Sequence, residues 1–439
     1  MARGKILVDV TPFRKYPQFF LLWSGFLVRT VGNQLTVVAV PYQVYRLTHS
    51  SLDVGLVSLV QLGPLLVGSL FGGTIADAFD RRRVLVATQV LLAATSVGLA
   101  LNSGAGASVW PLFVCSAAAA GFQGVDNPAS TAFIVNLVDR ETIVGANALW
   151  QVLFQAGQVA GPGVAGVLLA RFSIGVVYWI DVASYAASLV TVLFLRKSER
   201  PATGVQRELG FGAMVSGVRY LRGHQPLQGI FLADLSAMVF GMPRALFPAM
   251  GLVRFHGSAV TVGLLFAAPG VGSLVGSLLT GWVHNIRRQG RAVILAVVGW
   301  GVAITLFGLS PWLWPGLVFL GIGGAFDVFS AVFRGAILQL VTPRGIIGRM
   351  QAVQIAVVTG GPRLGDLEHG ALGAAVGSEL AVVSGGIACI VGVLLLVRYL
   401  PHFDRLTIDK GVVDFGGRGE RPADAGPAAA RERAAEASG

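Results

Sequence analysis

Short polar turns divide the chain into apolar runs of roughly 20 residues or more, and each run is long enough to cross a lipid bilayer as a helix. Of the 439 residues, 54% are hydrophobic and 13% are charged, whereas soluble domains carry about 25% charged residues. Only helices and closed barrels satisfy their backbone inside a bilayer, and barrel strands alternate in polarity instead of running continuously apolar. The pattern therefore predicts an all-α membrane protein with many spans.

Twelve candidate spans can be counted, with a long polar break after the sixth. We expect the spans at 18–45, 52–77, 84–103, 109–138, 143–170, 174–196, 226–254, 258–284, 291–309, 313–342, 347–374 and 378–400. This division predicts a cytoplasmic N-terminus (1–17), an N-terminal six-helix bundle (18–196), a cytoplasmic central loop (197–225), a C-terminal six-helix bundle (226–400) and a disordered cytoplasmic tail (401–439). Within the loop, residues 211–221 are expected to lie on the membrane as a short amphipathic helix.

The positive charge of the chain lies on one side of the expected membrane. The net charge is +11, and basic residues gather at the N-terminus, in alternate turns, in the central loop and near the C-terminus. Because positively charged loops stay in the cytoplasm, both chain ends are expected there. Orientation accounts for this charge without a nucleic-acid partner. The two cysteines, Cys115 and Cys389, lie singly in apolar runs, so neither a disulfide framework nor a metal site is expected.

The two halves of the chain repeat the same landmarks in the same order. Gly73-x-x-x-Asp77 with a basic turn is matched by Gly281-x-x-x-Asn285 with a basic turn, an offset of 281 − 73 = 208 residues. Gly161-Pro162 is matched by Gly361-Pro362, an offset of 361 − 161 = 200. A nearly constant offset predicts a duplicated six-helix unit, and transporters built this way bind their substrate between the two units.

The turn after the second span resembles motif A of the major facilitator superfamily. The matching residues are Gly73, Asp77, Arg81, Arg82 and Arg83. Ala78 replaces the usual arginine, and Asp80 stands where glycine is usual. The resemblance implies a conformational latch, in which Asp77 pairs with an arginine or with a helix N-terminus in one state and not in the other. The plainer alternative is a cytoplasmic turn whose charge orients the chain.

The fifth span carries a second motif of small residues. Gly157, Gly161, Pro162 and Gly166 resemble motif C of the same superfamily, which is associated with proton-driven antiporters that export their substrate. Small residues four apart let helices approach closely, and proline permits a bend. Ordinary close packing of helices is the alternative interpretation.

From about residue 17 to residue 405 the chain resembles the enterobactin-exporter-like branch of that superfamily. The similar segments include Ala39–Val44 followed by Leu47–Ser51, and Leu338–Pro343 followed by Ile347–Arg349. The branch exports catecholate siderophores, and many of its relatives are multidrug or macrolide efflux proteins. The resemblance implies two six-helix bundles around a central cavity, a small-molecule substrate and a place in the cell membrane.

Charged and amide side chains inside the spans are the candidate site, because such groups are costly in hydrocarbon and usually face a cavity. They are Arg29, Asn33, Gln34, Asp126, Asn127, Asp234, Asp327, Arg334, Arg363, Asp366 and Glu368. Burial favours the protonated form of a carboxylate, so Asp126, Asp327, Asp366 and Glu368 are candidate proton carriers. The alternative is permanent pairing with arginine, for which Arg363 and Asp366 have a suitable spacing. Asp126 has no arginine at helical spacing, which favours a functional role; Arg29 either binds an anionic oxygen or balances Asp126.

Together these features predict a secondary active transporter, most simply a proton-coupled exporter (an antiporter) of a small amphipathic or anionic molecule such as a siderophore or drug. Its expected partners are the substrate, protons and the lipid bilayer; its energy source is the proton gradient, with no cofactor, and it is expected to be a monomer. Proton-coupled uptake of an anionic nutrient through Arg29 and Arg363 is one alternative. A non-transporting sensor on a transporter scaffold is another. An enzyme is not expected, because no convergent nucleophile, base or metal set is visible.

Overall fold

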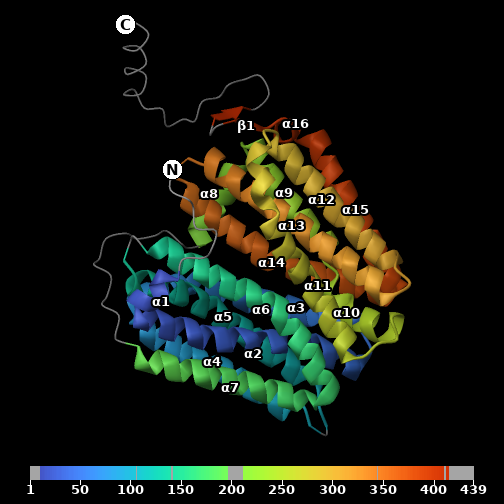
Figure 1. Ribbon diagram of the computed structural model, residues 1–439. Helices are drawn as coiled ribbons and strands as arrows, with labels where there is room; N and C mark the ends of the chain where they lie inside the picture. Colours follow the sequence, from blue (N-terminus) through green and yellow to red (C-terminus); the bar gives the residue numbers. More distant parts are fainter. Residues whose placement is uncertain are drawn as a thin grey trace, which may run out of the picture.

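The N-terminal half of the computed structural model is a bundle of long helices (Figure 1). The structure describes residues 10–104, 106–139, 142–195, 211–343, 345–409 and 412–414. After a short α1 (Thr11–Lys15), the helices of this half are α2 (Pro17–Thr48), α3 (Ser51–Ala78), α4 (Arg81–Leu101), α5 (Val109–Leu137), α6 (Ile143–Arg171) and α7 (Ile174–Phe194).

The C-terminal half begins with α8 (Phe211–Leu221), at the bounds expected for the amphipathic helix. Its long helices are α9 (Gln225–Phe240), α11 (Ala259–Leu278), α12 (Gln289–Leu309), α13 (Leu313–Val341), α14 (Ile347–Val376) and α15 (Ser378–Tyr399). Shorter elements are η1 (Arg244–Leu246), α10 (Phe247–Ala249), η2 (Met250–Arg254), η3 (Thr280–Asn285), α16 (Pro401–Asp404), β1 (Thr407–Asp409) and β2 (Val412–Asp414).

Most expected spans agree with observed helices to within a few residues. Among the described residues, 9 helices meet strict criteria of length and hydropathy for crossing a membrane. The long helices α2, α5 and α14 do not meet these criteria, and they carry most of the candidate site residues. The fold is therefore an all-α membrane fold of twelve spans in two six-helix bundles.

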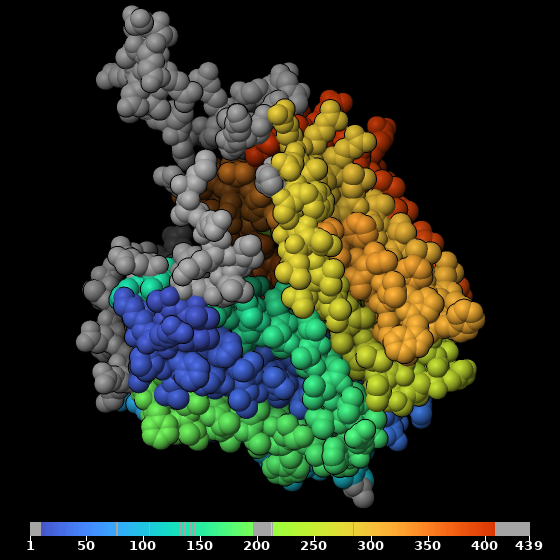
Figure 2. Space-filling model, viewed as in Figure 1, coloured from blue at the N-terminus to red at the C-terminus, as the bar shows by residue number. Residues whose placement is uncertain are grey.

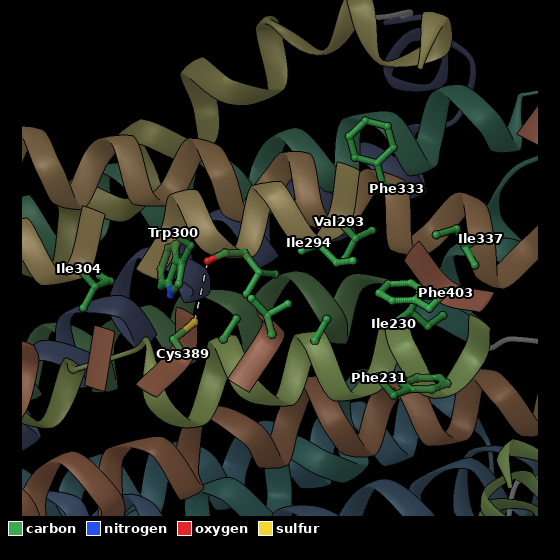
Figure 3. Packing of buried hydrophobic residues seen from close by; sticks show 14 of the residues in the cluster. Ile230, Phe231, Val293, Ile294, Trp300, Ile304, Phe333, Ile337, Cys389 and Phe403 are labelled. Atoms are coloured by element: carbon green, nitrogen blue, oxygen red, sulfur yellow. Dashed lines mark hydrogen bonds between the residues drawn. The ribbon is translucent and has the colours of Figure 1, made fainter. Parts of the chain in front are cut away.

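Each half uses the same packing pattern, as a duplicated unit requires. In the N-terminal half α3 and α4 pack on α5, and α2 and α4 pack on α7. In the C-terminal half α11 and α12 pack on α13, and α9 and α12 pack on α15. Helices of equal rank in the two halves therefore have equivalent neighbours. The largest buried cluster lies in the C-terminal bundle, where Trp300, Phe333 and Cys389 pack between helices and Cys389 Sγ lies 3.9 Å from the Val297 carbonyl oxygen (Figure 3).

The halves touch chiefly through two pairs of helices, α3 with α14 and α6 with α11, and smaller contacts join α3 with η1 and α2 with α10 and α11. Glycine permits both approaches. A Cβ on Gly55 would lie 2.4 Å from the carbonyl oxygen of Asp366, and a Cβ on Gly263 would lie 2.6 Å from that of Pro162. The space-filling view shows the halves parted by a hollow on the side where α1 and α16 lie (Figure 1 and Figure 2). The halves are thus closed on one side and open on the other.

The seventh span, Gln225–Arg254, agrees with the run expected at 226–254, but its helix is broken. Helix α9 ends at Phe240, and the chain continues through η1, α10 and the π-helical η2. Pro243 and Pro248 lie at this break, and proline lacks the N–H that a continuous helix needs. Arg244 follows the break directly, so it projects from the start of a new helical turn.

The structure also corrects the expectation of a disordered segment from residue 401. Phe403 and Leu406 are fully buried, and Phe403 packs on α9, where a Cβ on Gly229 would lie 2.2 Å from its ring. β1 and β2 form an antiparallel pair, and the Ile408 N–H donates to the Arg287 carbonyl oxygen at 2.8 Å. The apolar residues interspersed in this segment explain its order. Residues 415–439 lie outside the described part of the chain.

A polar contact outside the spans ties the chain start to the turn after α5. Asp139 accepts hydrogen bonds from the Tyr16 hydroxyl at 2.5 Å and from Lys15 Nζ at 3.0 Å. The Tyr16 hydroxyl and the Lys15 ammonium hold the pKa of Asp139 below its usual value, because both stabilise the carboxylate.

Candidate substrate cavity and buried charges

A cavity of about 270 Å³ lies between the two halves. Helices α2, α3, α4 and α5 line it from one side, and η1, α11 and α14 line it from the other. Its neutral polar side chains are Asn33, Thr36, Ser58, Gln61, Ser116 and Gln123. This is the central cavity, and its position matches the expectation of a site between duplicated units.

The charged groups of the central cavity come from the C-terminal half. They are Arg244, Arg363 and Asp366. Arg244 Nη2 lies 3.9 Å from Asp366 Oδ2, and Arg363 Nη1 donates to the Thr359 carbonyl oxygen at 2.7 Å. The Nε atoms of both arginines are buried without a hydrogen-bond partner among the described residues. Two guanidinium groups against one carboxylate leave the cavity with unused donors and excess positive charge.

A second cavity of about 370 Å³ lies within the N-terminal half, and Asn33 and Gln123 line both cavities. Arg29, Gln34 and Asn127 line this second cavity. Gln34 Nε2 donates to Gln158 Oε1 at 3.3 Å, and Gln123 Nε2 donates to Asn127 Oδ1 at 2.7 Å. Four of the predicted residues of the first and fourth spans, Arg29, Asn33, Gln34 and Asn127, therefore line one space.

Arg29 and Asp126 form a buried ion pair in the N-terminal bundle. Arg29 Nη1 lies 2.6 Å from Asp126 Oδ2, and the two residues are 6% and 0% exposed. Thr88 Oγ1 donates to Asp126 Oδ1 at 2.7 Å. The pairing of Arg29 with Asp126, which the sequence left open, is the arrangement observed. The partner comes from another helix, α2, which is why spacing along α5 alone does not reveal it.

The C-terminal bundle holds a second buried ion pair. Arg334 of α13 pairs with Asp234 of α9, and Arg334 Nη2 also lies 3.9 Å from Asp327 Oδ1. Asp234 and Arg334 are buried, whereas the Asp327 side chain is 41% exposed. All three line a cavity of about 200 Å³. Asp327 and Arg334, seven residues apart, do lie on one face of their helix.

The two ion pairs occupy equivalent positions with opposite polarity. Arg29 and Asp234 lie in the first helix of each bundle, at an offset of 234 − 29 = 205 residues; Asp126 and Arg334 lie in the fourth helix, at an offset of 334 − 126 = 208. These offsets agree with those of the repeated motifs. Each half thus has a buried ion pair between its first and fourth helices. The arginine lies in the first helix of the N-terminal half and in the fourth helix of the C-terminal half.

Glu368 lies away from the central cavity. Its Oε2 is 2.9 Å from Nδ1 of the fully buried His369. The charge-rich segment of the eleventh span is therefore divided: Arg363 and Asp366 face the central cavity, and Glu368 contacts a histidine of its own helix.

The turn resembling motif A is built by helix-end contacts. Asp80 Oδ1 accepts from the backbone N–H of Arg82 at 2.8 Å and of Arg83 at 3.3 Å, which caps the start of α4. Arg82 donates to the carbonyl oxygens of Val192, at 3.1 Å, and Leu193 at the end of α7, and Arg81 is buried. The side chain of Asp77 lies outside the described residues, so the latch stays a prediction.

The second copy of this turn, around Gly281 and Asn285 in the C-terminal half, lies in the 3-10 helix η3.

The motif C glycines lie at close helix contacts. A Cβ on Gly157 would lie 2.5 Å from Thr30 Cγ2, and one on Gly161 would lie 2.3 Å from Gln34 Cβ, both on α2. A Cβ on Gly166 would lie 2.9 Å from the Gly263 Cα of α11, in the other half. The motif therefore contributes both to packing within its bundle and to the contact between halves.

Sequence reasoning missed Asp181 of α7, which is 1% exposed. It accepts from Thr36 Oγ1 and from Ser96 Oγ, each at 2.8 Å. The criterion that selected Asp126, a carboxylate inside an apolar span, applies equally to Asp181 and would have found it.

The comparisons with known proteins agree with this fold. A family model described as "Transmembrane secretion effector" matches residues 8–411. The chain belongs to this family of major facilitator transporters. The enterobactin exporter EntS of Salmonella choleraesuis is 29% identical over 418 residues, covering 95% of this chain and 100% of that protein. The enterobactin exporter EntS of Citrobacter koseri is 29% identical over 400 residues, covering 90% of this chain and 95% of that protein.

Solved transporter structures share the fold. The nucleoside transporter NupG matches with a TM-score of 0.73 at 10% identity, covering 87% of this chain and 99% of that one. A peptide transporter, POT, matches with a TM-score of 0.72 at 12% identity, covering 89% of this chain and 95% of that one. This family member is therefore a multi-pass membrane transporter with the major facilitator fold.

Proposed function

We propose that this transporter exports a small catecholate-like or anionic molecule of the siderophore class. The observation that carries the proposal is the pair of arginines in the central cavity, Arg244 and Arg363, with buried and unused Nε donors. Guanidinium groups bind planar anionic oxygens with paired N–H donors. The relatives named as enterobactin exporters support a substrate of this chemistry.

Transport proceeds by alternating access in this proposal. The basic turns favour a cytoplasmic position for α1 and α16, so the hollow on their side faces the cytoplasm and receives the substrate. The contacts of α3 with α14 and of α6 with α11 then open on the opposite side while the cytoplasmic side closes. The protein works as a monomer without a cofactor.

Exchange against protons supplies the energy in this proposal. An exporter must move its substrate outward whatever the substrate gradient, and inward proton flow provides that driving force. The resemblance of the fifth span to motif C supports antiport. Uptake of an anionic nutrient through Arg29 and Arg363 is less favoured, because Asp126 holds Arg29 at 2.6 Å and only Arg363 keeps an unused donor.

Export can be tested in cells that make enterobactin but lack an exporter for it. We expect expression of this chain to raise enterobactin in the medium and lower it in the cells, and a protonophore to cancel the effect. Accumulation inside the cells would instead support uptake, and unchanged distribution would contradict transport of this substrate.

A matched pair of glycine variants tests alternating access in the same cells. In Gly263→Ala the new methyl group meets Pro162 and Gly166 at the contact between halves, whereas in Gly63→Ala it meets nothing within 4 Å. We expect Gly263→Ala to lower export and Gly63→Ala to leave it unchanged. Equal export by both would show that the α6–α11 contact takes no part in the transport cycle.

A further inference from the structure

Asp181 is a buried carboxylate that the proposed substrate site does not use. It lies in α7, and its two oxygens are surrounded by hydroxyl groups from three helices. Thr36 of α2 and Ser96 of α4 donate to Oδ2, each at 2.8 Å, and Ser184 Oγ lies 3.4 Å from Oδ1. No ion pair joins Asp181 to a lysine, arginine or histidine among the residues that the structure describes.

The neighbours of Asp181 suit both of its protonation states. A hydroxyl group donates to a carboxylate and accepts from a carboxyl group, since it carries one donor and two acceptor sites. Guanidinium groups only donate. Protonation of Asp126 would therefore leave the Arg29 charge buried without its partner, which is costly. Protonation of Asp181 leaves no buried cation behind, so a proton binds and leaves there at lower cost.

Asp181 is one side chain away from the central cavity. Thr36 lines that cavity, and its hydroxyl group also donates a hydrogen bond to Asp181. The space for the carboxylate comes from Gly32 of α2, where a Cβ would lie 2.8 Å from Asp181 Oδ1. The Thr36 hydroxyl thus connects the carboxylate to a space that changes its side of access during transport.

The same helix interface holds further polar groups with unused hydrogen-bonding capacity. Gln89 lies seven residues before Ser96 in α4, and Ser188 lies seven residues after Asp181 in α7. Both are fully buried, and neither side chain has a hydrogen-bond partner among the described residues. Buried amides and hydroxyls are normally satisfied by protein or by internal water. The α4–α7 interface therefore offers polar atoms that can hold internal water about 10 Å, or two helical turns, along the helices from Asp181.

The other titratable groups near Asp181 are a paired arginine, a thiol and two phenols, and thiols and phenols are uncharged when protonated. Arg29 of α2 is held by Asp126 of α5. Helix α4 faces Asp181 with Ser96, which does not titrate, and the charged residue of α6, Arg171, is its last residue. The remaining neighbours are Cys115 of α5 and, on α7 itself, Tyr178 and Tyr185. Asp181 is thus the group near this interface that we expect to gain or lose a proton.

We propose that Asp181 is a proton-binding site of the N-terminal bundle, which loads and releases its proton through Thr36 and the central cavity. This proposal rests on the proposed proton-driven export and names the carboxylate that couples it. The substrate binds to the arginines of the C-terminal half, and the proton binds in the N-terminal half. The two ligands thus act on opposite sides of the moving interface.

Infrared spectroscopy of the purified protein tests proton binding without any substrate. We expect the wild type minus Asp181→Asn difference spectrum to contain a carboxyl C=O band that vanishes as the pH is raised. The control Asp404→Asn removes a carboxylate from the short helix α16. The spectrum of this variant should still contain the titrating band. A difference spectrum without a titrating carboxyl band would overturn the proposal, and so would a titration set by sodium concentration.

Proteoliposomes with enterobactin as the probe test coupling. We expect Asp181→Asn to lose the uptake driven by a pH gradient, down to the level of empty liposomes, while enterobactin exchange at equal pH persists. Asp181→Glu keeps the carboxylate and should recover part of the driven uptake, which separates loss of the proton site from loss of folding. Full gradient-driven uptake by Asp181→Asn would refute this inference alone. Absence of gradient-driven uptake in the wild type would refute proton-driven export, while the infrared result still decides proton binding.

Discussion

At the scale of single residues, identical side chains have different surroundings, and the surroundings decide what each can do. Arg29 and Arg334 are held by carboxylates of neighbouring helices. Arg363 is held by a carbonyl oxygen of its own helix and keeps a buried, unused Nε. Of these three arginines, Arg363 is therefore the one with donor capacity for a substrate.

Replacement of Arg363 tests this distinction. We expect Arg363→Gln to raise the half-saturating enterobactin concentration by about tenfold or more, since a hydrogen bond to a charged group contributes roughly 1.5–3 kcal/mol. The maximal rate should change less than the affinity. Arg46→Gln serves as the matched control, because Arg46 is exposed at the end of α2 and lies over the Tyr42 ring. Concentration-dependent uptake into proteoliposomes measures both variants, and equal affinities would remove Arg363 from the substrate site.

At the scale of helices, the sequence predicted the spans and their duplication well, because long apolar runs and glycine motifs are local signals. It predicted less about partners. The pairing of Arg29 with Asp126 stayed open, since pairing between α2 and α5 depends on how the helices pack and not on spacing within one helix. The break in the seventh span is visible as Pro243 and Pro248, although hydropathy alone joins its two parts. Order in residues 401–409 depends on a tertiary contact, the burial of Phe403 against α9.

The reversed polarity of the two ion pairs gives a prediction at this scale. Arg29→Asp and Asp126→Arg, each alone, should destabilise the folded protein by about 3–5 kcal/mol, because each leaves like charges buried together. The double variant recreates the polarity found between α9 and α13 and should recover much of that loss. Thermal unfolding of the purified variants measures the recovery. If the two losses simply add in the double variant, the two charges do not interact in the folded protein.

At the scale of the whole molecule, the two halves supply different groups to the transport cycle. The C-terminal half supplies the charged groups of the central cavity, through the broken seventh span and α14. The N-terminal half supplies Asp181 and the cavity around Arg29. Contacts between halves on one side and a hollow on the other describe one of the two end states that alternating access requires.

The most direct test of this account is enterobactin transport by inverted membrane vesicles, in which the cytoplasmic face points outward. We predict that vesicles containing this protein take up enterobactin when their interior is made acidic, and that a protonophore stops the uptake. Vesicles without the protein provide the baseline. Uptake at that baseline level, or equal uptake with and without the pH gradient, would contradict proton-driven export.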